Sequence, residues 1–117
     1  MKKTKIYNYI IIGLILVFLL FTAKIVISDQ TKTETQKAHE KAVNICQQFF
    51  DNEITAAEAR ERLDGMYFPD TVDGNLIETY VGMISYDLLC YDTQGFDRYL
   101  RSIEDCFEKL KKLNVTD

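Results

Sequence analysis

Residues 76–113 read LIETYVGMISYDLLCYDTQGFDRYLRSIEDCFEKLKKL, and this stretch predicts the fold. Its second half, 94–113, repeats apolar residues at steps of three and four, which is the spacing of one helix face. Its first half, 76–91, is apolar around half of its circumference, as expected of a central and mostly buried helix. The apolar residues expected on that side are Leu76, Ile77, Tyr80, Val81, Met83, Ile84, Leu88, Cys90 and Tyr91. The short link at Asp92 and Thr93 predicts that the two helices are antiparallel neighbours.

Two further helices are predicted on the N-terminal side of this hairpin. Residues 33–51 place Ala38, Ala42, Ile45 and Phe49 on one face. A second helix begins at the capping box Thr55-Ala56-Ala57-Glu58 and stops at Asp64-Gly65, where glycine accepts a left-handed conformation. No segment has the pattern of a strand. The sequence therefore predicts an all-α fold, with a three- to four-helix bundle over residues 37–117.

The longest irregular stretch is 64–75, which sets aromatic residues beside acids and is the most site-like loop. It does not match a calcium-binding loop. When Gly74 is aligned with the required glycine, Pro69 and Thr71 occupy positions that need oxygen ligands. We therefore predict no metal ion and no cofactor for this loop.

The N-terminal part of the chain predicts a membrane anchor. Residues 6–27 are almost entirely apolar. As a helix they would extend for roughly 33 Å, enough to cross a bilayer. They follow a basic tail, 1–5, and precede a polar linker, 28–36. The alternative is a cleaved signal peptide, but the apolar run is longer than the roughly 7–15 residues usual for one.

Lysines on the two sides of this segment bear on its orientation. Three are clustered before it, at Lys2, Lys3 and Lys5, and three are spread after it, at Lys32, Lys37 and Lys41. The clustering favours a cytoplasmic N-terminus and an extracytoplasmic C-terminal domain in a single-pass protein of the cell membrane. All 18 acidic residues lie beyond residue 28, so that part carries a net charge of minus eight. A domain this acidic is a poor partner for nucleic acid.

Catalytic chemistry has little support in the sequence. His39 is the only histidine, and Cys46 lies seven residues further, about 10 Å along a helix, so the two cannot form a nucleophilic pair. Of the three cysteines, Cys46, Cys90 and Cys106, two could form a disulfide in an external domain, or all three could be small buried side chains. We predict that the chain is not an enzyme.

Asp87 breaks the apolar pattern of the helix over 76–91. A buried carboxylate is costly unless it is paired, so Asp87 either makes a structural hydrogen bond or contacts a ligand. The candidate ligand-binding residues are Asp87, Tyr80, Tyr91, Tyr67 and Phe68.

The architecture predicts a membrane-anchored helical interaction or adaptor module of a cell-envelope assembly. Its partners would be the lipid bilayer, through residues 6–27, and a membrane or envelope protein. The alternative is a membrane-tethered domain that senses or binds a small ligand.

Overall fold

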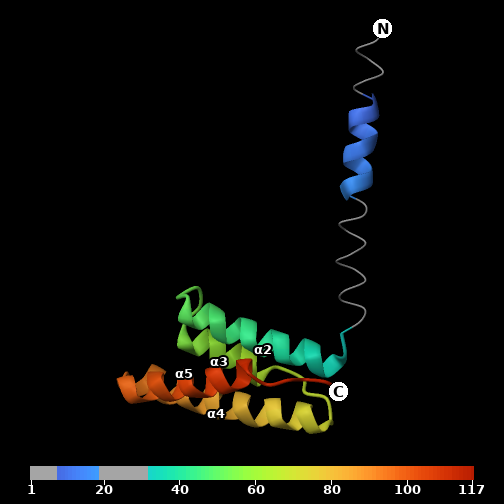
Figure 1. Cartoon of the computed structure of the whole chain (residues 1–117). Helices are drawn as coiled ribbons and strands as arrows, with labels where there is room; N and C mark the ends of the chain where they lie inside the picture. Colours follow the sequence, from blue (N-terminus) through green and yellow to red (C-terminus); the bar gives the residue numbers. More distant parts are fainter. Residues whose placement is uncertain (1–7, 19–31) are drawn as a thin grey trace. The chain divides into compact units, whose positions relative to one another are not determined.

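The computed structural model describes residues 8–18 and 32–117 (Figure 1). The chain divides into two compact units, Met1–Lys32 and Thr33–Asp117. In the first unit residues 8–18 are helical, and their large apolar side chains are all exposed. The predicted tail 1–5 and the remainder of the predicted membrane helix 6–27 lie outside the described residues, as do residues 28–31 of the predicted linker 28–36. Within the described ranges, no helix is both long and apolar enough to span a membrane.

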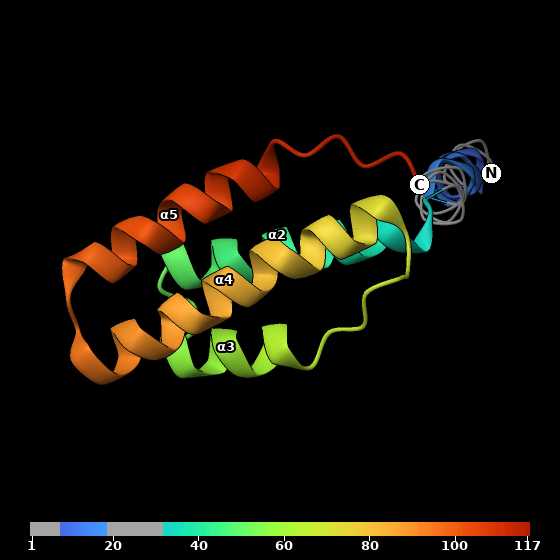
Figure 2. The ribbon, with the colours of Figure 1, turned by 90° about the horizontal axis from the view of Figure 1, so that it is seen from below.

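The second unit is a bundle of four helices, so the prediction of an all-α fold is confirmed. These are α2 (Glu34–Phe50), α3 (Ala56–Asp64), α4 (Val72–Gln94) and α5 (Asp97–Lys111). In Figure 2, α4 lies in front of α2, with α3 and α5 on either side of it. Helices α2 and α4 each contact all three other helices, and α4 is the central element because its contacts are the more extensive.

Capping boxes start the first two helices of the bundle. At Thr33 and Thr55 the hydroxyl accepts a bond from the backbone N–H three residues later, and the side chain of Gln36 or Glu58 reaches back. The second box confirms the predicted start of α3. The first places the start of α2 at Glu34, inside the stretch 28–36 that the sequence predicted as a linker.

The conformation predicted for Gly65 is wrong. Gly65 ends α3 with φ −85° and ψ 0°, a right-handed conformation, rather than the left-handed one expected. The Gly65 N–H donates a hydrogen bond to the carbonyl of Glu61, four residues earlier, so Gly65 continues the right-handed turn that ends α3.

Helix α4 is longer at both ends than the predicted range 76–91. Its early start depends on Thr71, whose hydroxyl accepts a bond of 2.9 Å from the N–H of Gly74. The chain packs so closely here that a Cβ on residue 74 would lie 2.1 Å from the carbonyl oxygen of Pro69. At the other end the helix runs through the predicted link and stops at Gly95, whose φ of 70° is left-handed. The reversal at Gly95 and Phe96 makes α4 and α5 antiparallel, as predicted (Figure 2).

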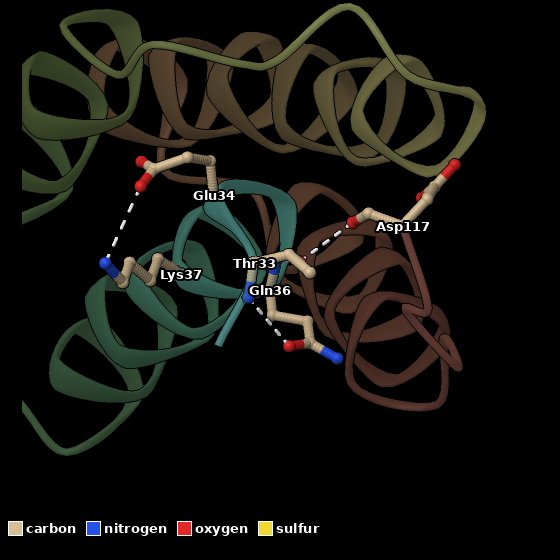
Figure 3. Close-up of polar contacts among 5 residues, drawn as sticks. All are labelled: Thr33, Glu34, Gln36, Lys37 and Asp117. Atoms are coloured by element: carbon tan, nitrogen blue, oxygen red, sulfur yellow. Dashed lines mark hydrogen bonds and ion pairs between the residues drawn. The ribbon is translucent and has the colours of Figure 1, made fainter. Parts of the chain in front are cut away.

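The C-terminal residues close one end of the bundle. The Thr33 hydroxyl donates to the carbonyl of Asp117 at 2.9 Å, as Figure 3 shows. The Gln36 side chain donates to the carbonyl of Val115, and the Thr116 N–H donates to the carboxylate of Asp73. These bonds bring the C-terminus to the start of α2, beside the first turn of α4.

The core lies between the four helices, and its apolar side chains come from all of them. The largest fully buried apolar side chains are Leu63, Ile77, Ile84, Leu88, Ile103 and Leu110. All three cysteines are buried and none is in a disulfide, so the reading of them as small buried side chains is confirmed. Two residues expected on the buried side of α4 are exposed instead, Leu76 and Met83.

Candidate interaction surface

One face of α4 is apolar and open to solvent. Five exposed residues on it follow one another at steps of four and three, and we call them the α4 seam: Val72, Leu76, Thr79, Met83 and Tyr86. The exposed fractions of the four large side chains are 80% for Val72, 40% for Leu76, 49% for Met83 and 65% for Tyr86. The opposite face of the same helix fills the core. Helix α4 is therefore apolar on two sides, and the rest of the bundle, Thr33–Asp117, covers only one of them.

The seam carries no charge. Helix α4 contains four acids and no lysine or arginine, and its acids lie off the seam, at Asp73, Glu78, Asp87 and Asp92. The pKa of Tyr86 is raised, mainly by a hydrogen bond to Cys90 and to a lesser extent by the charges of nearby groups. The Tyr86 hydroxyl is therefore neutral near pH 7. Exposed helix faces normally carry charged side chains, as α5 does with its alternating acids and bases. An uncharged apolar stripe on an exposed helix is typical of a contact surface.

Gly82 lies beside the seam, in the middle of α4. A glycine inside a helix costs about 0.5–1 kcal/mol relative to alanine. Among the described residues nothing requires it, because a Cβ on residue 82 would meet no atom within 4 Å apart from the neighbouring backbone of its own helix, and the backbone is helical. What Gly82 does provide is a short stretch of exposed α4 backbone that no side chain covers.

A groove of about 500 Å³ runs between the seam and α5, and Asp87 lies on its wall. Its lining consists of Thr79, Gly82, Met83, Tyr86, Asp87 and Ser102. The Ser102 hydroxyl donates to the Asp87 carboxylate at 2.6 Å. Asp87 is half-buried rather than enclosed in the core, and its partner is a serine of the neighbouring helix.

The other candidate ligand-binding residues do not gather around Asp87. Tyr80 and Phe68 are half-buried and pack against the core. Tyr91 lies 6.3 Å from Phe49, measured between ring centroids, and lines a different pocket. Tyr67 is 79% exposed. The five residues therefore do not form one pocket.

The pocket at Tyr91 lies at the turn between α2 and α3 and measures about 400 Å³. It is lined by Phe49, Phe50, Asn52, Glu53, Ile54, Thr55, Glu58, Tyr91 and Leu100. Several of these side chains have structural partners. The Phe50 ring packs edge-on against Phe107, with centroids 5.3 Å apart, and Glu58 closes the capping box of α3. Much of this lining therefore belongs to the core and to a helix start.

The cysteine thiols and His39 lie in surroundings that suit a structural role rather than catalysis. Burial raises the pKa of Cys46 to about 12. The pKa of Cys106 is also raised, mainly by burial and to a lesser extent by the charge of Asp87. Thiols with raised pKa values are poor nucleophiles near neutral pH. His39 Nε2 donates to the carbonyl of Leu110 at 2.6 Å, in the last turn of α5. Within residues 8–18 and 32–117, no three His, Cys, Asp or Glu side chains are placed to hold a metal ion.

Sequence reasoning missed the α4 seam because it assigned Leu76 and Met83 to the core. A signal was present: residues 72–86 carry apolar side chains on two opposite sides of one helix. No protein-family model, no curated protein and no solved structure matches the chain.

Proposed function

We propose that the chain is a membrane-anchored helical module of a cell-envelope assembly, and that it binds a protein partner through the α4 seam. The observation that carries this proposal is the uncharged apolar stripe on the central helix. Burying apolar surface contributes about 25 cal/mol per Å². The seam is thus the face on which a partner gains most from excluding water.

Membrane anchoring through residues 6–27 is the second part of the proposal. It is supported by the long apolar run and by the helix over 8–18, whose apolar side chains are exposed on all sides. The lysine cluster before the run favours a cytoplasmic N-terminus and an external bundle. An anchor raises the effective concentration of the seam for partners in the same membrane.

Site-specific photocrosslinking in living cells tests the docking surface. A photoreactive residue replaces Met83 in the seam, and a control carries it at Asn44, an exposed position on α2. We expect protein adducts from position 83 and few from position 44. Equal yields from both positions, or no adduct from position 83, would contradict the proposal.

Anchoring and topology have their own tests. Mass spectrometry of the mature protein reads its N-terminus, and a start near Asp29 would show cleavage rather than an anchor. A cysteine introduced at Asp117 should react with a membrane-impermeant reagent in intact cells. Reaction only after lysis would reverse the proposed orientation.

A second candidate function is the binding of a small ligand in the groove at Asp87. One observation favours it, namely a half-buried carboxylate on the wall of a groove of about 500 Å³. The hydrogen bond from Ser102 already satisfies that carboxylate in part, which makes this candidate the weaker one. A thermal-shift screen of small amines tests it: a shift that is lost in Asp87→Asn would support ligand binding.

A further inference from the structure

We propose that the partner on the α4 seam is a second copy of this chain, with the two α4 helices packed side by side and parallel. This inference rests on the proposed function, since it names the occupant of the same surface. Four features of the bundle favour a second copy, namely the spacing of the seam, its charge pattern, the glycine at position 82 and the end of the bundle at which α4 begins.

The seam has the spacing of a short two-stranded coiled coil. Steps of four, three, four and three residues place Leu76 and Met83 at the first apolar position of a heptad. Val72, Thr79 and Tyr86 then occupy the fourth position, and the seam extends for about 21 Å. In a parallel pair each of these residues faces the same residue of the other copy. The spacing therefore favours a helix, rather than a strand or a loop, as the occupant.

The residues that flank the seam permit a like-charged copy to approach. In a parallel pair the flanking contacts join Asn75 with Tyr80, Gly82 with Asp87, and Leu89 with Gln94. None of these contacts sets two charges of the same sign against each other. The bundle as a whole is strongly acidic, so two copies repel each other weakly at other faces. The seam is a face on which that repulsion is small.

Gly82 has a role in such a pair. It lies next to Met83 and opposite the half-buried Asp87 of the other copy. Without a side chain at this point, the second helix can approach closely, and the long Met83 side chain can fill the space above residue 82. The pair thus explains a glycine at a position where, among the described residues, there is room for a side chain.

The end of the bundle at which α2 and α4 begin favours the parallel orientation. The Thr35 and Thr71 hydroxyls are hydrogen-bonded at 3.0 Å, so α4 begins at the same end of the bundle as α2. If residues 6–27 anchor each copy, the chain enters every bundle at this end. A parallel pair then places the two points of entry at the same end of the pair, whereas an antiparallel pair places them at opposite ends.

The size of the seam predicts a weak pair that depends on the membrane. Four large side chains from each copy would bury on the order of 1,000 Å² in total, near the lower limit for a specific interface. Free in dilute solution, the bundles should be mostly monomeric. Confined to one bilayer, they should pair, because anchoring raises their effective concentration.

Disulfide trapping of the full chain in lipid vesicles tests this inference. Thr79→Cys places a thiol in the seam, and Glu78→Cys places one on the next exposed residue of the same helix, away from the seam. The native cysteines can remain because they are buried. Under mild oxidation we expect covalent dimers of Thr79→Cys at least fivefold above those of Glu78→Cys. Equal yields would overturn the proposal.

The register has a separate readout. Val72→Cys should also link to itself, because equal positions meet in a parallel pair. If Val72→Cys links only to Tyr86→Cys, the helices are antiparallel, and the proposed arrangement is wrong. Adding Met83→Glu to Thr79→Cys should reduce trapping at least tenfold, whereas adding Glu78→Gln should not.

The failure of this inference can be distinguished from the failure of the proposed function. If the photoreactive residue at position 83 joins a different protein and Thr79→Cys is not trapped, the docking surface stands and the second copy is excluded. If position 83 joins no protein, the docking surface itself is refuted.

Discussion

The two glycines of α4 predict opposite effects of one substitution. In Gly74→Ala the new methyl group would lie 2.1 Å from the carbonyl oxygen of Pro69 and 2.8 Å from the Thr71 hydroxyl. A backbone atom is the nearest obstacle, so the loop before α4 must move. In Gly82→Ala the methyl group meets nothing within 4 Å.

The magnitudes follow from these surroundings. Overpacking costs about 1–3 kcal/mol, and loss of the Thr71 cap adds about 1 kcal/mol. Replacing a helical glycine by alanine returns at most about 1 kcal/mol. We therefore expect Gly74→Ala to lower the free energy of unfolding by about 1–3 kcal/mol, and Gly82→Ala to raise it by about 0.5–1 kcal/mol.

Urea unfolding of the fragment Thr33–Asp117, followed by circular dichroism, measures both changes. The fragment contains the whole of the second compact unit. Dilute protein keeps any pairing through the seam out of the measurement. If Gly74→Ala proved as stable as Gly82→Ala, the close packing at Pro69 and the reasoning from it would be refuted.

Three further predictions concern other contacts. Asp87→Ala and Ser102→Ala should each cost about 1–2 kcal/mol, and a double-mutant cycle in urea should show that the losses are not additive, because both remove one hydrogen bond. The Thr116 N–H donates a hydrogen bond to Asp73, and this bond is the main cause of the lowered pKa of the Asp73 carboxyl. The contact therefore stabilises the fold above the usual carboxyl pKa. That stabilisation is lost as the pH falls through the lowered pKa. The hydrogen-exchange protection factor of the Thr116 amide, which removes the intrinsic pH dependence of exchange, should fall over that range, and in Asp73→Asn it should lose this pH dependence. Cys46, with its pKa raised to about 12, should resist alkylation at pH 8 until urea unfolds the chain, and mass spectrometry of the labelled protein would reveal earlier reaction.

Local features of the sequence predicted much of the bundle. The capping box at Thr55 and the apolar repeat over 94–113 depend on contacts within a few residues, and the structure has both helices there. The first turn of α4 escaped prediction because the Thr71 cap and the close approach of Gly74 to Pro69 become clear only in the folded loop.

The candidate site was harder to predict than the helices. Asp87 was identified from its place in an apolar helix, but its partner Ser102 belongs to the next helix and has no pattern of its own. The aromatic candidates were grouped by sequence and composition. Folding separates them, since Tyr91 points to the α2–α3 turn and Tyr67 to solvent.

By itself, the sequence determined the helical class, the capping box at Thr55 and the antiparallel hairpin, because these depend on short-range hydrogen bonds and on the period of apolar residues. The tertiary structure decided which side of α4 is covered. Val72–Tyr86 is apolar on two opposite sides, so periodicity alone cannot choose between them. Packing against α2, α3 and α5 buries the side with Ile77, Ile84 and Leu88, because those residues fit between three helices, and it leaves the α4 seam exposed.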